Sequence, residues 1–214
     1  MNPYIGFILC AGEGRRSIIE GVSINKGNYP LPDGTTPISR IVSQLAEGGI
    51  EKVFIVIKQT TPDFESLKRA VTNIPIELVD DCGGAPYPIL SLSKAFAKLE
   101  IAPNAECLVS VSDVLFDESV SDLIAHPLLD KELALGWHKN RFTGCFKASF
   151  VTLYRMCQQN AKIAKSDQLI AHCESLGGFV SRLDVGSIHV GSVEEYARYM
   201  ISELATTNPY LTSL

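Results

Sequence analysis

The most constraining feature of this chain is a short apolar stretch that runs straight into a glycine-rich loop. Ile5 to Leu9 is apolar around Gly6, which predicts a buried strand of a parallel sheet. The loop that follows, residues 11–16, reads Ala-Gly-Glu-Gly-Arg-Arg. Glycines let backbone N–H groups approach an anion closely, and arginine adds a planar pair of donors. The stretch predicts a phosphate-binding turn at the end of the first strand, although a plain strand-to-helix turn also uses glycines.

The spacing after this loop excludes two common phosphate-binding motifs. A Walker A loop would continue with Gly-Lys-Ser or Gly-Lys-Thr, which does not follow here. The dinucleotide fingerprint would need a third glycine where the chain has Ser17. The loop must therefore be interpreted together with the elements that come after it.

Strand and helix patterns alternate along the first part of the chain. Continuous apolar runs predict buried strands, and apolar residues spaced three and four apart predict helices. The predicted strands cover 53–57, 76–79 and 107–111, and the predicted helices cover 38–47, 61–71, 89–99 and 120–125. This alternation is typical of an α/β fold in which helices cover both faces of a mostly parallel sheet.

The second part of the chain mixes shorter strands with three more helices. Strands are predicted over 133–137, 143–147, 179–183 and 187–190, and helices over 150–159, 166–176 and 193–204. In the last helix we expect four residues to face the core: Tyr196, Tyr199, Met200 and Leu204. Because no repeat, linker or low-complexity run interrupts the sequence, residues 1–214 are expected to form one domain.

The composition favours a cytoplasmic protein that binds a small anion. The net charge is −5 and the basic residues are scattered, which argues against nucleic acid as a main partner. No apolar run approaches the length of a membrane span, and the first residues do not resemble a signal peptide. The six cysteines form no C-x-x-C pair, as expected for reduced, buried thiols. These features leave the oligomeric state, including a homo-oligomer, open.

Three features of the sequence follow directly after predicted strands. The glycine-rich loop follows Leu9, a second loop with glycine and proline spans 80–88, and Asp113 comes shortly after Val111. Ligands of open α/β sheets bind beyond the carboxyl ends of the strands, so we expect these features to meet at one edge. A carboxylate at that edge suits Mg²⁺, which takes few protein oxygens and completes its shell with phosphate and water. An aspartate there can also cap a helix.

The glycine-rich loop also resembles a known signature. Residues 9–16 are similar to the L-A-A-G-x-G-T-R motif that opens nucleotidyltransferases of the sugar-1-phosphate type. Cys10 stands in place of an alanine, and Arg15 in place of the usual threonine. The resemblance implies a nucleotide-binding site formed by Leu9, Ala11, Gly12, Glu13, Gly14 and Arg16.

A second segment resembles the same family. Residues 25–38 are similar to its P-K-x-L-L-P-v-x-G-k-P-l stretch, with two extra residues and with Asn25 in place of the proline. The resemblance implies that Lys26 stabilises charge at the α-phosphate, a role that suits a mobile point charge. Arg16 and Lys26 are the catalytic residues that it implies. A solvated loop lysine is the alternative.

Two further segments match the family in the same order. Residues 81–85, which include Gly83, resemble the glycine-rich loop that backs the nucleotide base. Residues 110–116 resemble its G-D-x-L-F segment, with Ser112 in place of the glycine. The resemblance therefore implies that Asp113 is a ligand of Mg²⁺.

The position of a second metal ligand has two interpretations. Residues 189–196 resemble the family's D-I-G-T-P-E-D-Y segment, but the aspartate is His189 here, and Mg²⁺ prefers oxygen ligands. A different alignment, on residues 184–187, makes Asp184 the ligand instead. His189 is also compatible with an ordinary histidine at the end of a strand.

The family resemblance implies both a fold and an activity. The fold is a Rossmann-like three-layer α/β/α sandwich of the nucleotide-diphospho-sugar transferase type. The activity is transfer of NMP from an NTP to a sugar 1-phosphate, with Mg²⁺ as cofactor, so the partners are an NTP and a small phosphorylated acceptor. A cytidylyltransferase acting on a phosphorylated alcohol such as phosphocholine, and a catalytically weak nucleotide-binding homologue, are the alternatives. A glycosyltransferase of related fold is less favoured because Asp113 is not part of a D-x-D pair.

Overall fold

The fold is built on a seven-stranded sheet with one antiparallel strand inside it. The computed structural model describes residues 2–11, 25–58, 64–67, 73–80, 88–159, 163 and 165–207. The strand order is β3-β2-β1-β4-β7-β6-β8. The strands are β1 (Tyr4–Leu9), β2 (Lys52–Ile57), β3 (Ile76–Asp80), β4 (Glu106–Val111), β6 (Glu132–His138), β7 (Arg141–Ser149) and β8 (Phe179–Asp184).

Parallel pairing dominates this sheet, as the alternating pattern predicted. β1 pairs in parallel with β2 and β4, β2 with β3, and β6 with β8. Only β7 runs antiparallel, to both of its neighbours β4 and β6. Leu9 of β1 lies opposite Val111 of β4, so both strands leave the sheet at the same edge. The segments that follow β1 and β4 are thereby brought side by side.

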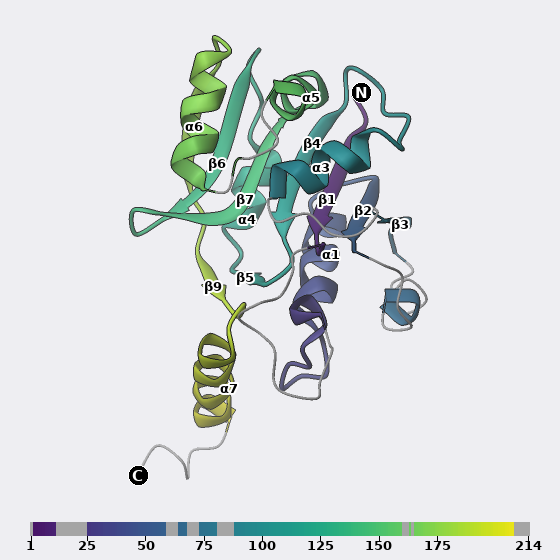
Figure 1. Cartoon of the computed structure of the whole chain (residues 1–214). Coiled ribbons are helices and arrows are strands. Elements are labelled where there is room, and N and C mark those ends of the chain that lie inside the picture. Colours follow the sequence, from purple (N-terminus) through teal and green to yellow (C-terminus); the bar gives the residue numbers. More distant parts are fainter. Residues whose placement is uncertain are drawn as a thin grey trace.

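Helices cover both faces of the sheet (Figure 1). One apolar cluster joins the sheet to α3, α5 and α6, and a second cluster joins it to α1 and α4. The three-layer α/β/α arrangement is therefore confirmed. Among the described ranges, no helix has the length and apolar character needed to cross a bilayer. The helices are α1 (Pro37–Glu47), α3 (Pro88–Phe96), α4 (Val120–Ala125), α5 (Phe150–Gln159), α6 (Ser166–Ser175) and α7 (Val193–Thr207).

Helix α1 shows how local sequence signals set an element. Thr36 caps its first turn: the hydroxyl accepts from the Ser39 backbone N–H, and Ser39 reciprocates in a capping box. Pro37 occupies the first turn, where its missing N–H costs nothing. Gly49 follows the helix with φ of 85°, a conformation that favours glycine. The buried face is the predicted one: Ile38, Ile41, Val42 and Leu45.

A second, two-stranded sheet brings the C-terminal part of the chain back to the end of β4. It consists of β5 (Val114–Phe116) and β9 (Ser187–His189), which pair antiparallel. Helix α7 follows β9 and extends away from the main sheet (Figure 1). The strand at β5 was not predicted, because three apolar residues after Asp113 are too few to show a period.

Two helix predictions need correction, and a third lies partly outside the described residues. The predicted helix 89–99 ends earlier, at Phe96. Of the predicted helix 61–71, the structure describes residues 64–67, which are helical. Leu204, predicted to face the core, is 46% exposed. The reason is that the part of α7 carrying Leu204 lies away from the sheet, so the apolar period there has no core to meet (Figure 1).

A buried lysine ties β7 to the helix layer. The side chain of Lys147 is only 3% exposed, and its Nζ donates to the carbonyl oxygens of Ile124 and His126 at 2.8 Å each. The same Nζ lies 2.9 Å from Oε2 of Glu106 on the neighbouring strand. It also lies 4.5 Å from the centroid of the Tyr4 ring. The lysine charge is thus compensated by two carbonyl oxygens, one carboxylate and one aromatic ring.

We expect Lys147→Met to lower the free energy of unfolding by about 3 kcal/mol, because it leaves two carbonyls and a carboxylate without their donor. Urea denaturation measures this loss. Lys52→Met is the matched control: its pair with Glu77, at 2.6 Å, joins side chains that are 41% and 46% exposed. Its effect should stay below about 1 kcal/mol. Equal losses in the two variants would contradict a special role for Lys147.

Candidate active site

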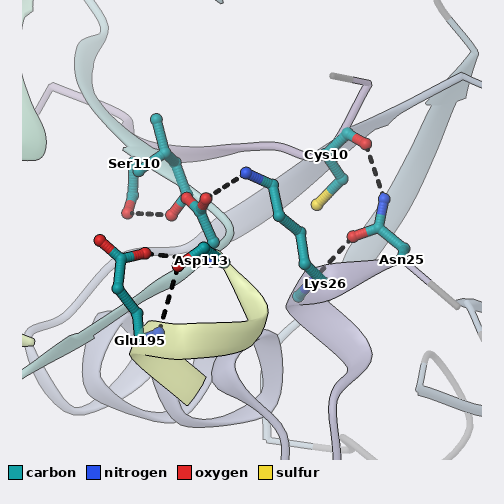
Figure 2. A network of polar contacts seen from close by, with 9 residues as sticks. Cys10, Asn25, Lys26, Ser110, Asp113 and Glu195 are labelled. Carbon is teal, nitrogen blue, oxygen red and sulfur yellow. Dashed lines mark hydrogen bonds and ion pairs between the residues drawn. The ribbon is translucent and has the colours of Figure 1, made fainter. Parts of the chain in front are cut away.

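Two residues named from the sequence meet at the edge where β1 and β4 end. Nζ of Lys26 donates to Oδ2 of Asp113 in a close ion pair (Figure 2). The two side chains are 20% and 14% exposed, so the pair is largely withdrawn from solvent but still accessible. The structure thus brings Lys26 and Asp113, which are far apart in the sequence, to one edge of the sheet.

The turn that carries Lys26 is tied to the end of β1. Lys26 begins the short 3-10 helix η1 (Lys26–Asn28). Nδ2 of Asn25 donates to the carbonyl oxygen of Cys10 at 2.8 Å, and its Oδ1 accepts from the backbone N–H of Gly27 at 3.0 Å (Figure 2). One amide side chain therefore bridges the first strand and the lysine turn. This role of Asn25 was not predicted from the sequence, although an asparagine that accepts from the N–H two residues later is a typical local turn signal.

Close packing at Gly27 seats the same turn against its neighbours. Gly27 is buried, and a Cβ built on it would lie 2.6 Å from the side chain of Ile38 and 2.9 Å from Cβ of Ser112. Any larger residue would push the turn away from α1 and from the end of β4. A glycine at this position therefore allows Lys26 to approach Asp113.

Asp113 is held by the returning C-terminal segment. Its backbone carbonyl accepts from the N–H of Val190 at 2.9 Å, which extends the β5–β9 pairing. Gly191 comes next, and a Cβ there would lie 2.1 Å from Oδ2 of Asp113 and 3.3 Å from Nζ of Lys26. The absence of a side chain at Gly191 leaves the space that the ion pair fills.

Helix α7 begins directly beside this pair. Ser192 and Glu195 form its capping box: the Ser192 N–H donates to Oε2 of Glu195 at 3.0 Å, and the Glu195 N–H donates to Oγ of Ser192 at 3.2 Å. Figure 2 shows Glu195 below Asp113, on the first turn of this helix. The start of α7 is thus defined by its own side chains and not by the ion pair.

Cys10 lies next to the site but belongs to the core. Burial raises the pKa of its thiol to about 12, and a hydrogen bond with Ser112 offsets this shift only in part. The group stays a neutral thiol near pH 7, which suits a packing residue and not a nucleophile. Burial likewise raises the thiol pKa of the other cysteines in the described ranges: Cys107, Cys145, Cys157 and Cys173.

The two candidate second ligands occupy different surroundings. Asp184 ends β8; its Oδ1 lies 2.8 Å from Nδ1 of His138, and its side chain is 84% exposed. His189 is exposed at the end of β9, where it pairs with Val114, the residue after Asp113. Strand pairing thus places the His189 backbone, and not that of Asp184, beside the ion-pair segment. Within the described ranges, no three His, Cys, Asp or Glu side chains gather as a metal-binding group.

Part of the predicted nucleotide site lies outside the described residues. These predictions concern Gly12, Glu13, Gly14, Arg16 and Gly83. Leu9 and Ala11 are described and are 8% and 1% exposed, within the apolar cluster at the end of β1. Their side chains therefore pack inward, and only their backbone is placed to contribute to a ligand site.

The sequence matches a known protein family over most of its length. A sequence profile of the MobA-like NTP transferase domain matches residues 6–175. No curated protein gives a significant match to the sequence. The profile covers both segments that supply the ion pair.

Solved structures share the fold at low sequence identity. The chain is similar to the inositol-1-phosphate CTP transferase from T. maritima, with 13% identity, 94% and 96% of the two chains covered, and a TM-score of 0.69. It is also similar to HddC from Yersinia pseudotuberculosis, with 15% identity, 94% and 99% coverage, and a TM-score of 0.67. UDP-glucose pyrophosphorylase from Acinetobacter baumanii gives 12% identity, 99% and 96% coverage, and a TM-score of 0.67.

These similarities show that the chain shares the α/β fold of these proteins. Because the family profile matches most of the chain, from β1 to the end of α6, the chain belongs to the MobA-like NTP transferase domain family and is a nucleotidyltransferase.

Proposed function

We propose that this nucleotidyltransferase transfers NMP from an NTP to a sugar 1-phosphate, forming an NDP-sugar and pyrophosphate. The observation that carries the proposal is the pair of Lys26 and Asp113 at the edge where β1 and β4 end. A cation and a carboxylate in one partly enclosed position are the groups that a triphosphate and its metal ion require. The glycine-rich segment that the sequence predicts to bind phosphate follows β1 in the chain and lies outside the described residues; backbone N–H groups in it would add to the anion site.

The reaction needs little covalent chemistry from the protein. A phosphate oxygen of the acceptor attacks the α-phosphorus, the new P–O bond forms, and the bond to the pyrophosphate oxygen breaks with its electron pair. A phosphate nucleophile is already ionised near pH 7, so no general base is required. Lys26 would stabilise the charge that builds up on the oxygens around the α-phosphorus, and positioning would supply the rest of the acceleration.

The residues present fit a Mg²⁺ ion as the cofactor. Asp113 offers a carboxylate at a strand end, and Mg²⁺ binds through one or two carboxylates while taking its other ligands from phosphate and water. The ion would neutralise charge on the triphosphate. Lys26 and Asp113 neutralise each other in their present pairing; with substrate bound, Lys26 would pair with the triphosphate and Asp113 with the metal ion.

A second acceptor class is a phosphorylated alcohol that receives CMP. The fold similarity to the inositol-1-phosphate CTP transferase, which covers 94% of this chain and 96% of the transferase, supports a phosphorylated polyol within this class. A further hypothesis is that the protein binds a nucleotide but catalyses transfer only weakly. Two replacements in the family segments support it: His189 in place of an aspartate and Ser112 in place of a glycine.

We expect pyrophosphate release when the protein is incubated with Mg²⁺, one NTP and one acceptor from a matched panel. The panel crosses four NTPs with sugar 1-phosphates, inositol 1-phosphate and phosphocholine, and a coupled phosphate assay detects the product. The sugar-1-phosphate proposal predicts the highest kcat/KM in that group. The absence of release with every pair, with Mg²⁺ or Mn²⁺, would exclude all the catalytic readings.

We expect Lys26→Met and Asp113→Asn each to lower kcat/KM by about 100-fold or more, because each removes a charge used at the triphosphate. Steady-state kinetics measure the loss, and thermal unfolding checks that the variants remain folded. Lys52→Met is the matched lysine control, since Lys52 opens β2 at the opposite edge of the sheet and should change kcat/KM little. A control that loses activity to the same extent would refute a specific role for Lys26.

We expect His189→Asp to lower the Mg²⁺ concentration that gives half-maximal turnover, because a carboxylate binds Mg²⁺ better than an imidazole does. Titration of activity with Mg²⁺ at saturating NTP measures this value. Asp184→Asn separates the two alignments, since a raised Mg²⁺ requirement in that variant would assign the ligand to Asp184. If the native protein binds NTP without turnover and the His189→Asp variant also shows no turnover, the protein is a catalytically weak nucleotide-binding homologue.

A further inference from the structure

We propose that β9 and α7 act as a clasp that positions Lys26 against Asp113, with Tyr196 as a positioning residue. The inference rests on the proposed role of the Lys26–Asp113 pair in nucleotidyl transfer. The clasp lies beyond residue 175, where the match to the family profile ends. Its role therefore rests on contacts within this chain.

The first contact is between α7 and the loop that carries Lys26. The hydroxyl of Tyr196 donates a hydrogen bond to the carbonyl oxygen of Pro30. The ring of Tyr196 also packs on the ring of Tyr29, with centroids 5.0 Å apart. Tyr29 and Pro30 directly follow η1, so α7 holds the far end of the turn whose near end Asn25 ties to β1.

The second contact is between the same segment and Asp113. The backbone N–H of Val190 donates to the Asp113 carbonyl, and Gly191 leaves the space in which the carboxylate meets the amine. One continuous stretch thus contacts Asp113 through Val190 and the loop that follows Lys26 through Tyr196. The separation of the two charges depends on where this stretch docks.

The docking surface is a small apolar cluster of its own. It is separate from the two large clusters that join the helices to the main sheet. A segment held by a few buried contacts opens at a lower free energy than the core does. The clasp can therefore be loosened without unfolding the sheet. The cluster consists of Leu31, Leu115, Val190 and Tyr199, with Tyr196 and Met200 packed against it.

Anchoring the backbone matters more for lysine than for a rigid side chain. A lysine amine is a point charge on a flexible four-carbon stem, so its average position follows the base of that stem. A displacement of about 1 Å at a reacting centre can lower a rate by about 100-fold. With Asn25 fixing the loop before Lys26 and the clasp fixing the loop after it, the amine can take fewer positions.

The test measures the exposure of the Lys26 amine directly. Intact protein is labelled briefly with an amine-reactive reagent, and mass spectrometry reports the labelling rate at each lysine. We expect Tyr196→Phe, which removes only the hydroxyl, to raise labelling at Lys26 about fivefold, the change that one net hydrogen bond supports. Tyr196→Ala, which also removes the ring contact, should raise it further. Labelling at Lys52 should not change.

Kinetics provide the second readout. Loss of positioning should lower kcat in the order native, Tyr196→Phe, Tyr196→Ala, with KM for the NTP changed less than kcat. Tyr154→Ala is the matched control: Tyr154 lies on α5, is 42% exposed, and its ring packs on the ring of Phe150 with centroids 5.7 Å apart. This variant should leave kcat and Lys26 labelling as they are in the native protein.

The outcomes separate the clasp from the proposed function. Unchanged Lys26 labelling in both Tyr196 variants overturns the clasp, whatever the enzyme's substrate. Equal increases at all lysines also overturn it, because they indicate general loosening of the fold. A selective increase at Lys26 in a protein without turnover supports the clasp and refutes the proposed function. If Tyr196→Ala does not fold, Tyr196→Phe decides alone.

Discussion

The arrangement of the site depends on a partly buried ion pair that contributes little to stability by itself. Removing Lys26 and Asp113 from water costs free energy that their attraction only offsets when the geometry is good. Such a pair persists only where the surrounding structure forces the charges together. Here that structure is the Asn25 bridge on one side and the β9 backbone on the other, with glycines at 27 and 191 providing the room. The pair is therefore a consequence of the fold around it, which is how pre-organised sites are built.

Strand order explains why segments so distant in sequence supply this pair. β1 and β4 are neighbours in the centre of the sheet, and their carboxyl ends open at the same edge. The turn at Lys26 folds back onto the end of β1, while Asp113 follows β4 directly. The antiparallel strand β7 lies on the other side of β4 and ends the run of parallel strands there. The chain later returns through β9, which pairs with β5 next to Asp113. The crossover connections thus bring together residues that are far apart in the sequence.

Sequence patterns predicted those parts of the fold that depend on local period and on strand ends. The apolar runs of β1 and β2, the capped helix α1 and the position of Asp113 after β4 belong to this class. The contact of Tyr196 with Pro30 spans 166 residues, and nothing local to either residue encodes it. The short strand β5 likewise exists only because β9 pairs with it. What escaped prediction is long-range pairing, which is decided by packing and not by propensity.

Because His189 stands where the family segment has an aspartate, the proposed metal site has one fewer carboxylate ligand. The carboxylate of Asp184 pairs with His138, whereas the carboxylate of Asp113 pairs with Lys26. Asp113 is therefore the candidate metal ligand that lies beside the lysine. A single carboxylate binds Mg²⁺ weakly, because the ion then needs most of its oxygens from elsewhere. A triphosphate supplies those oxygens and also supplies the anion that Lys26 would bind on leaving Asp113. Nucleotide and metal would therefore bind as one unit, each completing the site for the other, and the ion pair would hold the two charges in place between turnovers.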